Sequence, residues 1–195
     1  MLESLLVAGA ISLAQPQLAE AFYTHYHVKQ VFCDTARGTA VRLERGRFAT
    51  VSHVTSNKGC RIEGQPVKVE YDDPFTDFAI VTIPNDPGWG GVELNCAGFQ
   101  EGYWYYAVGF ARGIPASVVI SIRNGGPFVF HTYLRSWSIF KGIEYIIPGM
   151  SGGMAMDFYG RMTGMNNAYN DTEGLSWSLP ISETILCEGR SGGPL

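Results

Sequence analysis

Charged residues are scarce in this sequence. Asp, Glu, Lys and Arg together make up 16% of the 195 residues, and the formal net charge is −4. Affinity for a phosphate backbone requires clustered Lys and Arg, so no nucleic-acid partner is expected. Beyond the N-terminal residues, no apolar run approaches the roughly 20 residues that a membrane-spanning helix requires. No transmembrane segment is therefore expected.

Metal and redox motifs are missing as well. The four cysteines, at positions 33, 60, 96 and 187, have no C-x-x-C spacing, which leaves a zinc site or a thioredoxin-like pair without support. We expect no metal and no other cofactor. Buried free thiols are the simplest interpretation, but Cys33 and Cys60 could form a bridge in an oxidising compartment. The disulfide state of Cys33, Cys60, Cys96 and Cys187 stays open.

The first residues allow two interpretations. Residues 1–14 have the length of a signal-peptide core, yet Glu3 stands where such a peptide carries a basic residue. The alternative is a short N-terminal helix that Pro16 ends. Secreted, periplasmic and virus-encoded origins all remain open, and so does the oligomeric state.

Turn formers and β formers are abundant. The sequence contains 24 Gly, 10 Pro and 13% aromatic residues, which favours many short strands over long helices. Apolar or alternating runs fall into two series on either side of the turn-rich segment 84–91. We predict an all-β fold with two barrels and a cleft between them. The expected division is an N-terminal segment 1–30, a first barrel 31–88, a second barrel 89–184 and a tail 185–195.

A serine lies among glycines in the segment Pro-Gly-Met-Ser-Gly-Gly at 148–153. Glycines allow a tight loop whose backbone N–H groups turn toward a shared point. Ser151 is therefore a candidate nucleophile, and the N–H groups of Gly149 and Ser151 are candidate donors to an oxyanion. The alternative interpretation is an ordinary glycine-rich turn.

A nucleophilic serine also needs a base and a carboxylate that orients the base. His53 follows the β-patterned run 48–52, and Asp77 stands at the entrance of an apolar strand, where a buried carboxylate needs a partner. Taken singly, a histidine at such a position is more often structural than catalytic, and Asp77 is as well explained as a solvated turn or capping residue. Together they complete a predicted triad in which His53 is the general base and Asp77 orients it.

Six parts of the sequence follow one another in a specific order: 39–41 with 48–54, 76–81, 106–110, 148–153, 157–166 and 174–181. In this order they resemble the chymotrypsin-like, or trypsin-like, serine peptidases, closest to the HtrA or Deg branch and its compact viral relatives. The similarity covers roughly residues 38–182. It implies two six-stranded antiparallel β-barrels with the active site in the cleft between them, and a serine endopeptidase that cleaves polypeptides through an acyl-enzyme intermediate.

The sequence departs from this family at several points. Met150 replaces the aspartate that pairs with a newly cut N-terminus in zymogen-type enzymes, so activation by that route is not expected. Few residues follow Ser182, so no PDZ domain is expected. The resemblance places Tyr145 at the base of the substrate pocket and implies that Met165, Asn166 and Asn167 line its wall. A small or medium apolar P1 residue is predicted; alternatively, Tyr145 and Met165 are plain core residues.

Two other functions remain open from the sequence alone. A catalytically silent domain with a peptide-binding or structural role is suggested by the aromatic run 103–106 and by Met150. A serine-dependent esterase or acyl transferase would use the same triad. A second serine, Ser191, lies in a C-terminal S-G-G-P-L segment. It is set aside because the strands that build the pocket must follow the nucleophile.

Overall fold

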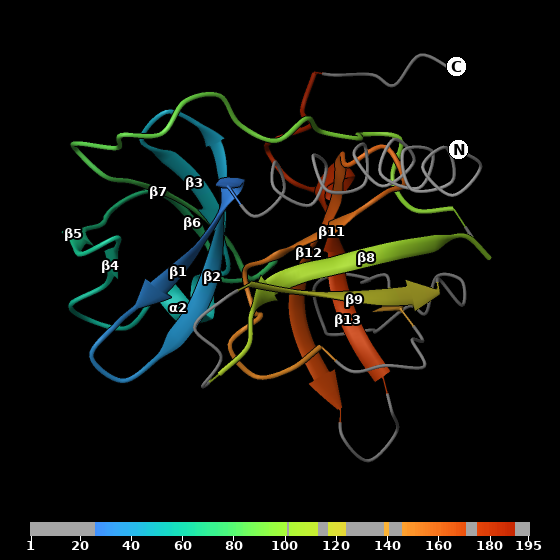
Figure 1. Ribbon diagram of the computed structural model, residues 1–195, viewed down its shortest axis with the longest axis horizontal. Coiled ribbons are helices and arrows are strands. Elements are labelled where there is room, and N and C mark those ends of the chain that lie inside the picture. Colours follow the sequence, from blue (N-terminus) through green and yellow to red (C-terminus); the bar gives the residue numbers. More distant parts are fainter. Residues whose placement is uncertain are drawn as a thin grey trace, which may run out of the picture.

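The computed structural model describes residues 26–100, 102–112, 117–123, 139–140, 146–170 and 175–189. Two antiparallel sheets lie side by side in this part of the chain, and the segment from residue 83 to residue 100 leads from the first sheet toward the second (Figure 1). The predicted N-terminal helix, Tyr145 and Ser191 lie outside the described residues. None of the described helices is long and apolar enough to span a membrane.

The first sheet has the strand order β5-β4-β1-β2-β3-β7-β6. Two-residue strands β4 and β5 bring its count to seven, where six were predicted. The strand β1, with Val28 and Val31 buried, was not among the predicted runs. The strands are β1 (Val28–Phe32), β2 (Arg37–Glu44), β3 (Arg47–Thr50), β4 (Arg61–Ile62), β5 (Gln65–Pro66), β6 (Lys68–Asp73) and β7 (Phe78–Thr82).

The second sheet has the order β10-β13-β12-β11-β8-β9, six strands among the described residues. Its strands are β8 (Trp104–Phe110), β9 (Ser117–Arg123), β10 (Ile139–Phe140), β11 (Met154–Met156), β12 (Met162–Asn170) and β13 (Leu175–Pro180). Two short helices complete the described chain, α2 (Ser52–Thr55) and the 3-10 helix η1 (Ile181–Glu183). The architecture is thus almost entirely β, as predicted.

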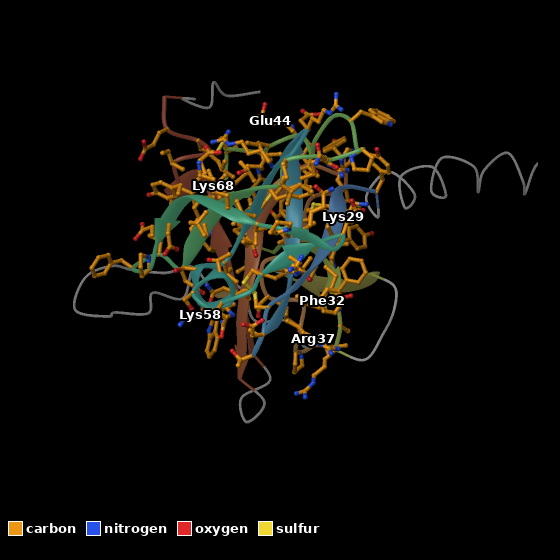
Figure 2. All side chains as sticks on the ribbon, turned by 90° about the vertical axis from the view of Figure 1, so that its left-hand side faces the viewer. Lys29, Phe32, Arg37, Glu44, Lys58 and Lys68 are labelled. Carbon is orange, nitrogen blue, oxygen red and sulfur yellow. A yellow bond between two sulfur atoms is a disulfide. The ribbon has the colours of Figure 1, made fainter. Side chains whose placement is uncertain are left out.

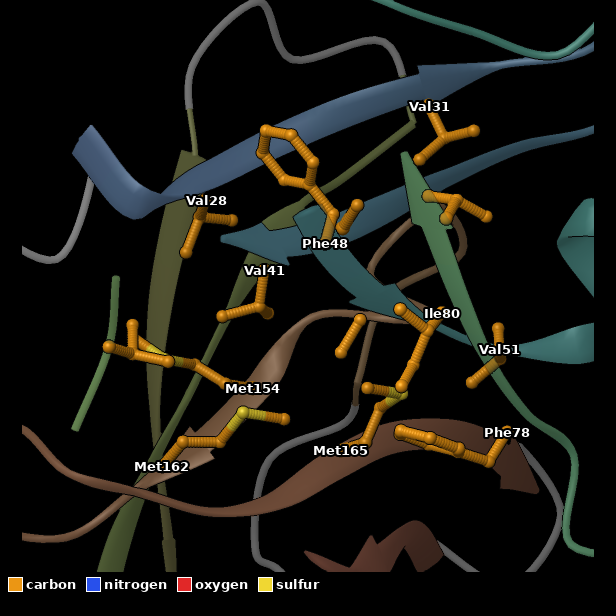
Figure 3. Close-up of a cluster of buried hydrophobic side chains, with 14 of the residues drawn as sticks. Val28, Val31, Val41, Phe48, Val51, Phe78, Ile80, Met154, Met162 and Met165 are labelled. Carbon is orange, nitrogen blue, oxygen red and sulfur yellow. The ribbon is translucent and has the colours of Figure 1, made fainter. Parts of the chain in front are cut away.

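One hydrophobic core joins the two sheets. Val41 and Phe48 from the first sheet pack in the same cluster as Met154, Met162 and Met165 from the second (Figure 3). Each of these side chains is 0% exposed. Strands with side chains alternating between faces place one row of apolar residues inward, so the shared core sets the two sheets at a defined distance.

Polar side chains cover the outer side of the first sheet. Lys58 and Lys68 are exposed there, and Lys29 forms an ion pair with Glu63. Figure 2 looks onto this side and shows these lysines spread over it and not gathered in one patch. Exposed, dispersed charge of this kind solvates the surface and contributes little to stability.

Two disulfide bonds tie loops to the sheets. Cys33 is bonded to Cys60, and Cys96 to Cys187. The interpretation of the cysteines as free thiols is therefore wrong, and the bridge between Cys33 and Cys60 is present. The first disulfide encloses α2, and the second joins the segment between the sheets to the segment after η1.

Candidate active site

His53 and Asp77 meet because β3 pairs with β7. The register places Thr50 opposite Ala79, so the residues just beyond the two strand ends lie next to each other. His53 then sits in α2, immediately after β3, and Asp77 immediately before β7. The first sheet alone therefore builds this half of the site.

The Asp77 carboxylate makes two contacts with His53. Its Oδ1 accepts the backbone N–H of His53 at 2.7 Å, and its Oδ2 lies 2.6 Å from the ring Nδ1. Because a carboxylate oxygen only accepts, the ring proton lies on Nδ1 and leaves Nε2 able to take a proton. The histidine side chain is 49% exposed and the aspartate 16%. The base is thus open to solvent, while its partner is largely covered.

Ser151 lies in a loop whose carbonyl groups are all held. From Pro148 to Ser151, the four consecutive carbonyl oxygens accept hydrogen bonds from Arg112 N, Thr39 Oγ1, Gly153 N and Thr39 N, at 2.6 to 2.9 Å. A trans peptide directs its N–H opposite to its C=O. The orientation of every peptide plane in the loop is therefore set.

Two N–H groups of this loop have no acceptor among the described residues. Those of Met150, Gly152 and Gly153 bond to Ile147, Asn166 and Met150. Those of Gly149 and Ser151 donate to no atom in the part of the chain that the structure describes. They are the pair predicted from the sequence as oxyanion donors, and both are available to an external acceptor.

The glycines of the loop are required by space as well as by conformation. Gly149 has φ of 98°, and a Cβ there would lie 2.6 Å from the Phe110 carbonyl oxygen. At Gly152, with φ of 84°, a Cβ would overlap the backbone carbonyl oxygen of Thr39. Side chains rarely adopt such φ values, so no other residue fits either position without moving the backbone.

Asn167 links the two halves of the site. Its side-chain Nδ2 donates to Asp77 Oδ2 at 2.7 Å, and its backbone oxygen accepts the Ser151 hydroxyl at 3.1 Å. Asp77 and Ser151 thus converge on one residue of β12. The sequence identified Asn167 only as part of a substrate pocket; its amide contact with Asp77 depends on how the two sheets pack.

Two of the other predicted substrate-binding side chains, those of Met165 and Asn166, lie in the interior. Met165 and Asn166 are both 0% exposed. Met165 packs in the core, and Asn166 Nδ2 donates to the Val108 carbonyl at 3.1 Å. The structure does not bring these two side chains to an open surface, so a contact with substrate through the backbone of this strand stays a prediction.

Among the described residues, no group of three or more His, Cys, Asp or Glu side chains is arranged to hold a metal ion. The chemistry available at this site is that of an imidazole, a carboxylate, a hydroxyl and two free backbone N–H groups. Groups of these kinds are the ones that acyl transfer uses.

By sequence, no family model and no curated protein matches the chain. Solved structures do match. An inactive form of Rv3671c from M. tuberculosis H37Rv superposes with a TM-score of 0.74 at 16% identity, over 90% of this chain and 92% of that one. The HtrA-type protease AlgW superposes with a TM-score of 0.72 at 19% identity, over 88% of this chain and 62% of that one. The serine endoprotease from Yersinia pestis gives 0.71 at 16% identity, over 88% and 64%.

These similarities show the fold. The chain has the chymotrypsin-like, two-sheet fold of the HtrA-type serine proteases, as the sequence predicted. Identities of 16% to 19% carry the architecture and not the activity. Function must therefore be argued from the site itself.

Proposed function

We propose that the protein is a serine endopeptidase in which Ser151 is the nucleophile, His53 the general base and Asp77 the residue that orients His53. The observation that carries this proposal is the convergence of Ser151 and Asp77 on Asn167. Ser151 comes from the second sheet and Asp77, which contacts His53, from the first, so a shared contact on Asn167 supports one site made by both sheets. The proteases that share this fold support the same conclusion.

The proposed reaction has two steps. Ser151 Oγ attacks the carbonyl carbon of the peptide bond while its proton passes to His53 Nε2, and the N–H groups of Gly149 and Ser151 receive the oxyanion. The intermediate collapses to an acyl-enzyme, and the leaving amine takes the proton from His53. Water then attacks the ester, with His53 again as base, and releases the acid and the free serine.

The resting hydroxyl must turn before it reacts. Ser151 Oγ donates to the Asn167 carbonyl at 3.1 Å, so proton transfer to His53 requires this hydroxyl to turn away from that carbonyl. Staggered rotamers interconvert readily at a partly exposed side chain, and catalytic hydrogen bonds often form only when substrate is bound. Substrate binding would complete the Ser151 to His53 contact.

The test compares wild type, Ser151→Ala and His53→Ala on an unfolded protein substrate and with a fluorophosphonate probe. Wild type should cleave the substrate and be labelled, and each variant should lose at least about 10⁴-fold in kcat/KM. Ser182→Ala, an exposed serine beyond β13, is the matched control and should behave as wild type.

Each other outcome identifies another function. Wild type that is neither labelled nor active would mean a catalytically silent domain, and peptide binding without turnover would support that role. Labelling and hydrolysis of activated esters without peptide cleavage would indicate an acyl transferase or esterase. Equal cleavage by wild type and Ser151→Ala would remove Ser151 from the mechanism.

A further inference from the structure

Thr39 of the first sheet contacts the nucleophile loop at two places. It lies in β2 and is 0% exposed. Its N–H donates to the Ser151 carbonyl at 2.8 Å, and its hydroxyl donates to the Gly149 carbonyl at 2.8 Å. One residue of the first sheet therefore holds both ends of the segment that carries the oxyanion donors.

The direction of the Thr39 hydroxyl is set by a third contact. The N–H of Phe110, at the end of β8, donates to Thr39 Oγ1 at 2.9 Å. Because that N–H occupies an acceptor position of the oxygen, the single hydroxyl hydrogen is directed to Gly149. The Thr39 hydroxyl thus links the end of β8 to the Gly149 carbonyl through two hydrogen bonds. Both bonds lie in a buried environment, where hydrogen bonds are stronger than in water.

The peptide that Thr39 holds lies between the two oxyanion donors. Gly149 N–H precedes the peptide joining residues 149 and 150, and Ser151 N–H follows it. Gly149 has no Cβ and adopts φ of 98°, so its own torsional preferences do not fix the peptide. This peptide is held on both sides, by the Met150 N–H bond to the Ile147 carbonyl and by the Thr39 hydroxyl bond to the Gly149 carbonyl. The Thr39 bond is the one that comes from the first sheet, and the relative direction of the two N–H groups depends on it.

We propose that Thr39 is a positioning residue for the oxyanion donors: its side-chain hydroxyl, through the Gly149 carbonyl, keeps the N–H groups of Gly149 and Ser151 aimed at one point. This inference rests on the peptidase function proposed above. Thr39 touches neither substrate nor the reacting atoms in this role. It acts on the transition state through the backbone, because the oxyanion develops there and not in the bound substrate.

The test uses Thr39→Val, which keeps the shape and removes the hydroxyl, and Thr39→Ser, which keeps the hydroxyl. The kcat of Thr39→Val should fall by about 10²-fold, the effect of losing one oxyanion donor. Its KM should stay within about 2-fold, since ground-state binding does not use these donors. Affinity for a peptidyl boronic acid, which forms a tetrahedral adduct, should fall with kcat, and Thr39→Ser should restore both.

Thr184 offers a matched control. Its hydroxyl also donates to a backbone carbonyl, that of Ile181 at 2.8 Å, and accepts a backbone N–H, that of Leu186 at 3.3 Å. It is 5% exposed and lies at the end of η1. Thr184→Val should lower stability in the same way as Thr39→Val but leave kcat and boronic acid affinity unchanged.

Amide hydrogen exchange gives a readout that needs no activity. In Thr39→Val, exchange at Met150 and Gly153, whose N–H groups bond within the loop, should accelerate at least about 10-fold relative to Thr184→Val. Unchanged exchange in this loop would overturn the role of Thr39 even if the enzyme were active. So would equal kcat losses in Thr39→Val and Thr39→Ser, or a matching loss in Thr184→Val. If wild type is inert toward the fluorophosphonate, the peptidase function fails, and the exchange result still decides whether Thr39 orders the loop.

Discussion

Met150 anchors the loop that carries Ser151 by apolar burial. Its side chain is 0% exposed and packs with Tyr105, Ala107, Ala111 and Ile146. Zymogen-type relatives are expected to place an aspartate at this point, paired with a new N-terminus. Here the hydrophobic effect holds the same position of the loop, so no charge pair is needed to keep Ser151 in place.

Met150→Asp should therefore unfold the protein more easily. A carboxylate in this cluster would lack a partner, and burying it should cost more than about 3 kcal/mol of unfolding free energy. Urea denaturation measures the change, with Met150→Leu as a control expected to cost less than about 1.5 kcal/mol. A stability of Met150→Asp within about 1 kcal/mol of wild type would show that the pocket supplies a partner for the charge.

At the scale of elements, the two disulfides close loops of very different length. The bridge between Cys96 and Cys187 spans 91 residues, and the bridge between Cys33 and Cys60 spans 27. The Cys96–Cys187 bridge fastens the chain after η1 to the segment between the sheets. The Cys33–Cys60 bridge encloses the helix that carries His53. The long loop joins distant elements, whereas the short one stabilises local geometry at the site.

Removing each bridge should separate these effects. In the chain-entropy account, the double variant Cys96→Ala with Cys187→Ala should lose about 1 kcal/mol more stability than Cys33→Ala with Cys60→Ala, out of about 3–5 kcal/mol each. The shorter bridge should matter more for kcat, because it borders α2. Thermal unfolding and peptide hydrolysis measure both quantities. The reverse order in both would contradict this division of roles.

At the scale of the whole molecule, one buried ion pair fastens the first sheet to the segment leading to the second. Arg42 of β2 donates to both carboxylate oxygens of Asp86, at 2.8 and 2.6 Å, and the two side chains are 1% and 0% exposed. Burial alone would raise the pKa of Asp86, but hydrogen bonds from Arg42, Gly46 and Gly88 outweigh it and lower this pKa to about 2.

The low pKa of Asp86 predicts a specific loss of stability in acid. A carboxylate with a folded pKa of about 2 and an ordinary value of 3.8 stabilises the fold fully above about pH 4 and loses that contribution as the pH falls toward 2. The contribution is about 2 kcal/mol. Unfolding measured from pH 6 to 2 should show this loss.

Two variants test the assignment to Asp86. Asp86→Asn should be less stable than wild type at pH 7. Its unfolding free energy should also change less between pH 4 and pH 2 than that of wild type. Glu70→Gln, which removes an exposed partner of Arg47, should leave the profile unchanged because exposed pairs contribute little. An unchanged acid profile in Asp86→Asn would mean that other carboxylates determine the acid limit.

The sequence by itself determined the fold class and the candidate triad. Alternating apolar runs and turn residues are local signals, so they predicted the all-β architecture, and the order of His53, Asp77 and Ser151 pointed to the site. The β3 and β7 runs that bring His53 to Asp77 were both readable from their apolar pattern. The pairing of His53 with Asp77 was also predictable, since a histidine base needs a carboxylate to orient it.

Only the tertiary structure decided which other residues complete the site. Thr39 reaches Gly149 across 110 residues of sequence, and Asn167 reaches Asp77 across 90. Neither residue stands out in the local sequence, because Thr39 is a threonine within a strand and Asn167 directly follows another asparagine. Their roles follow from the shared core, in which Phe48 and Met165 set the two sheets against each other, and packing of that kind depends on contacts that no local pattern records.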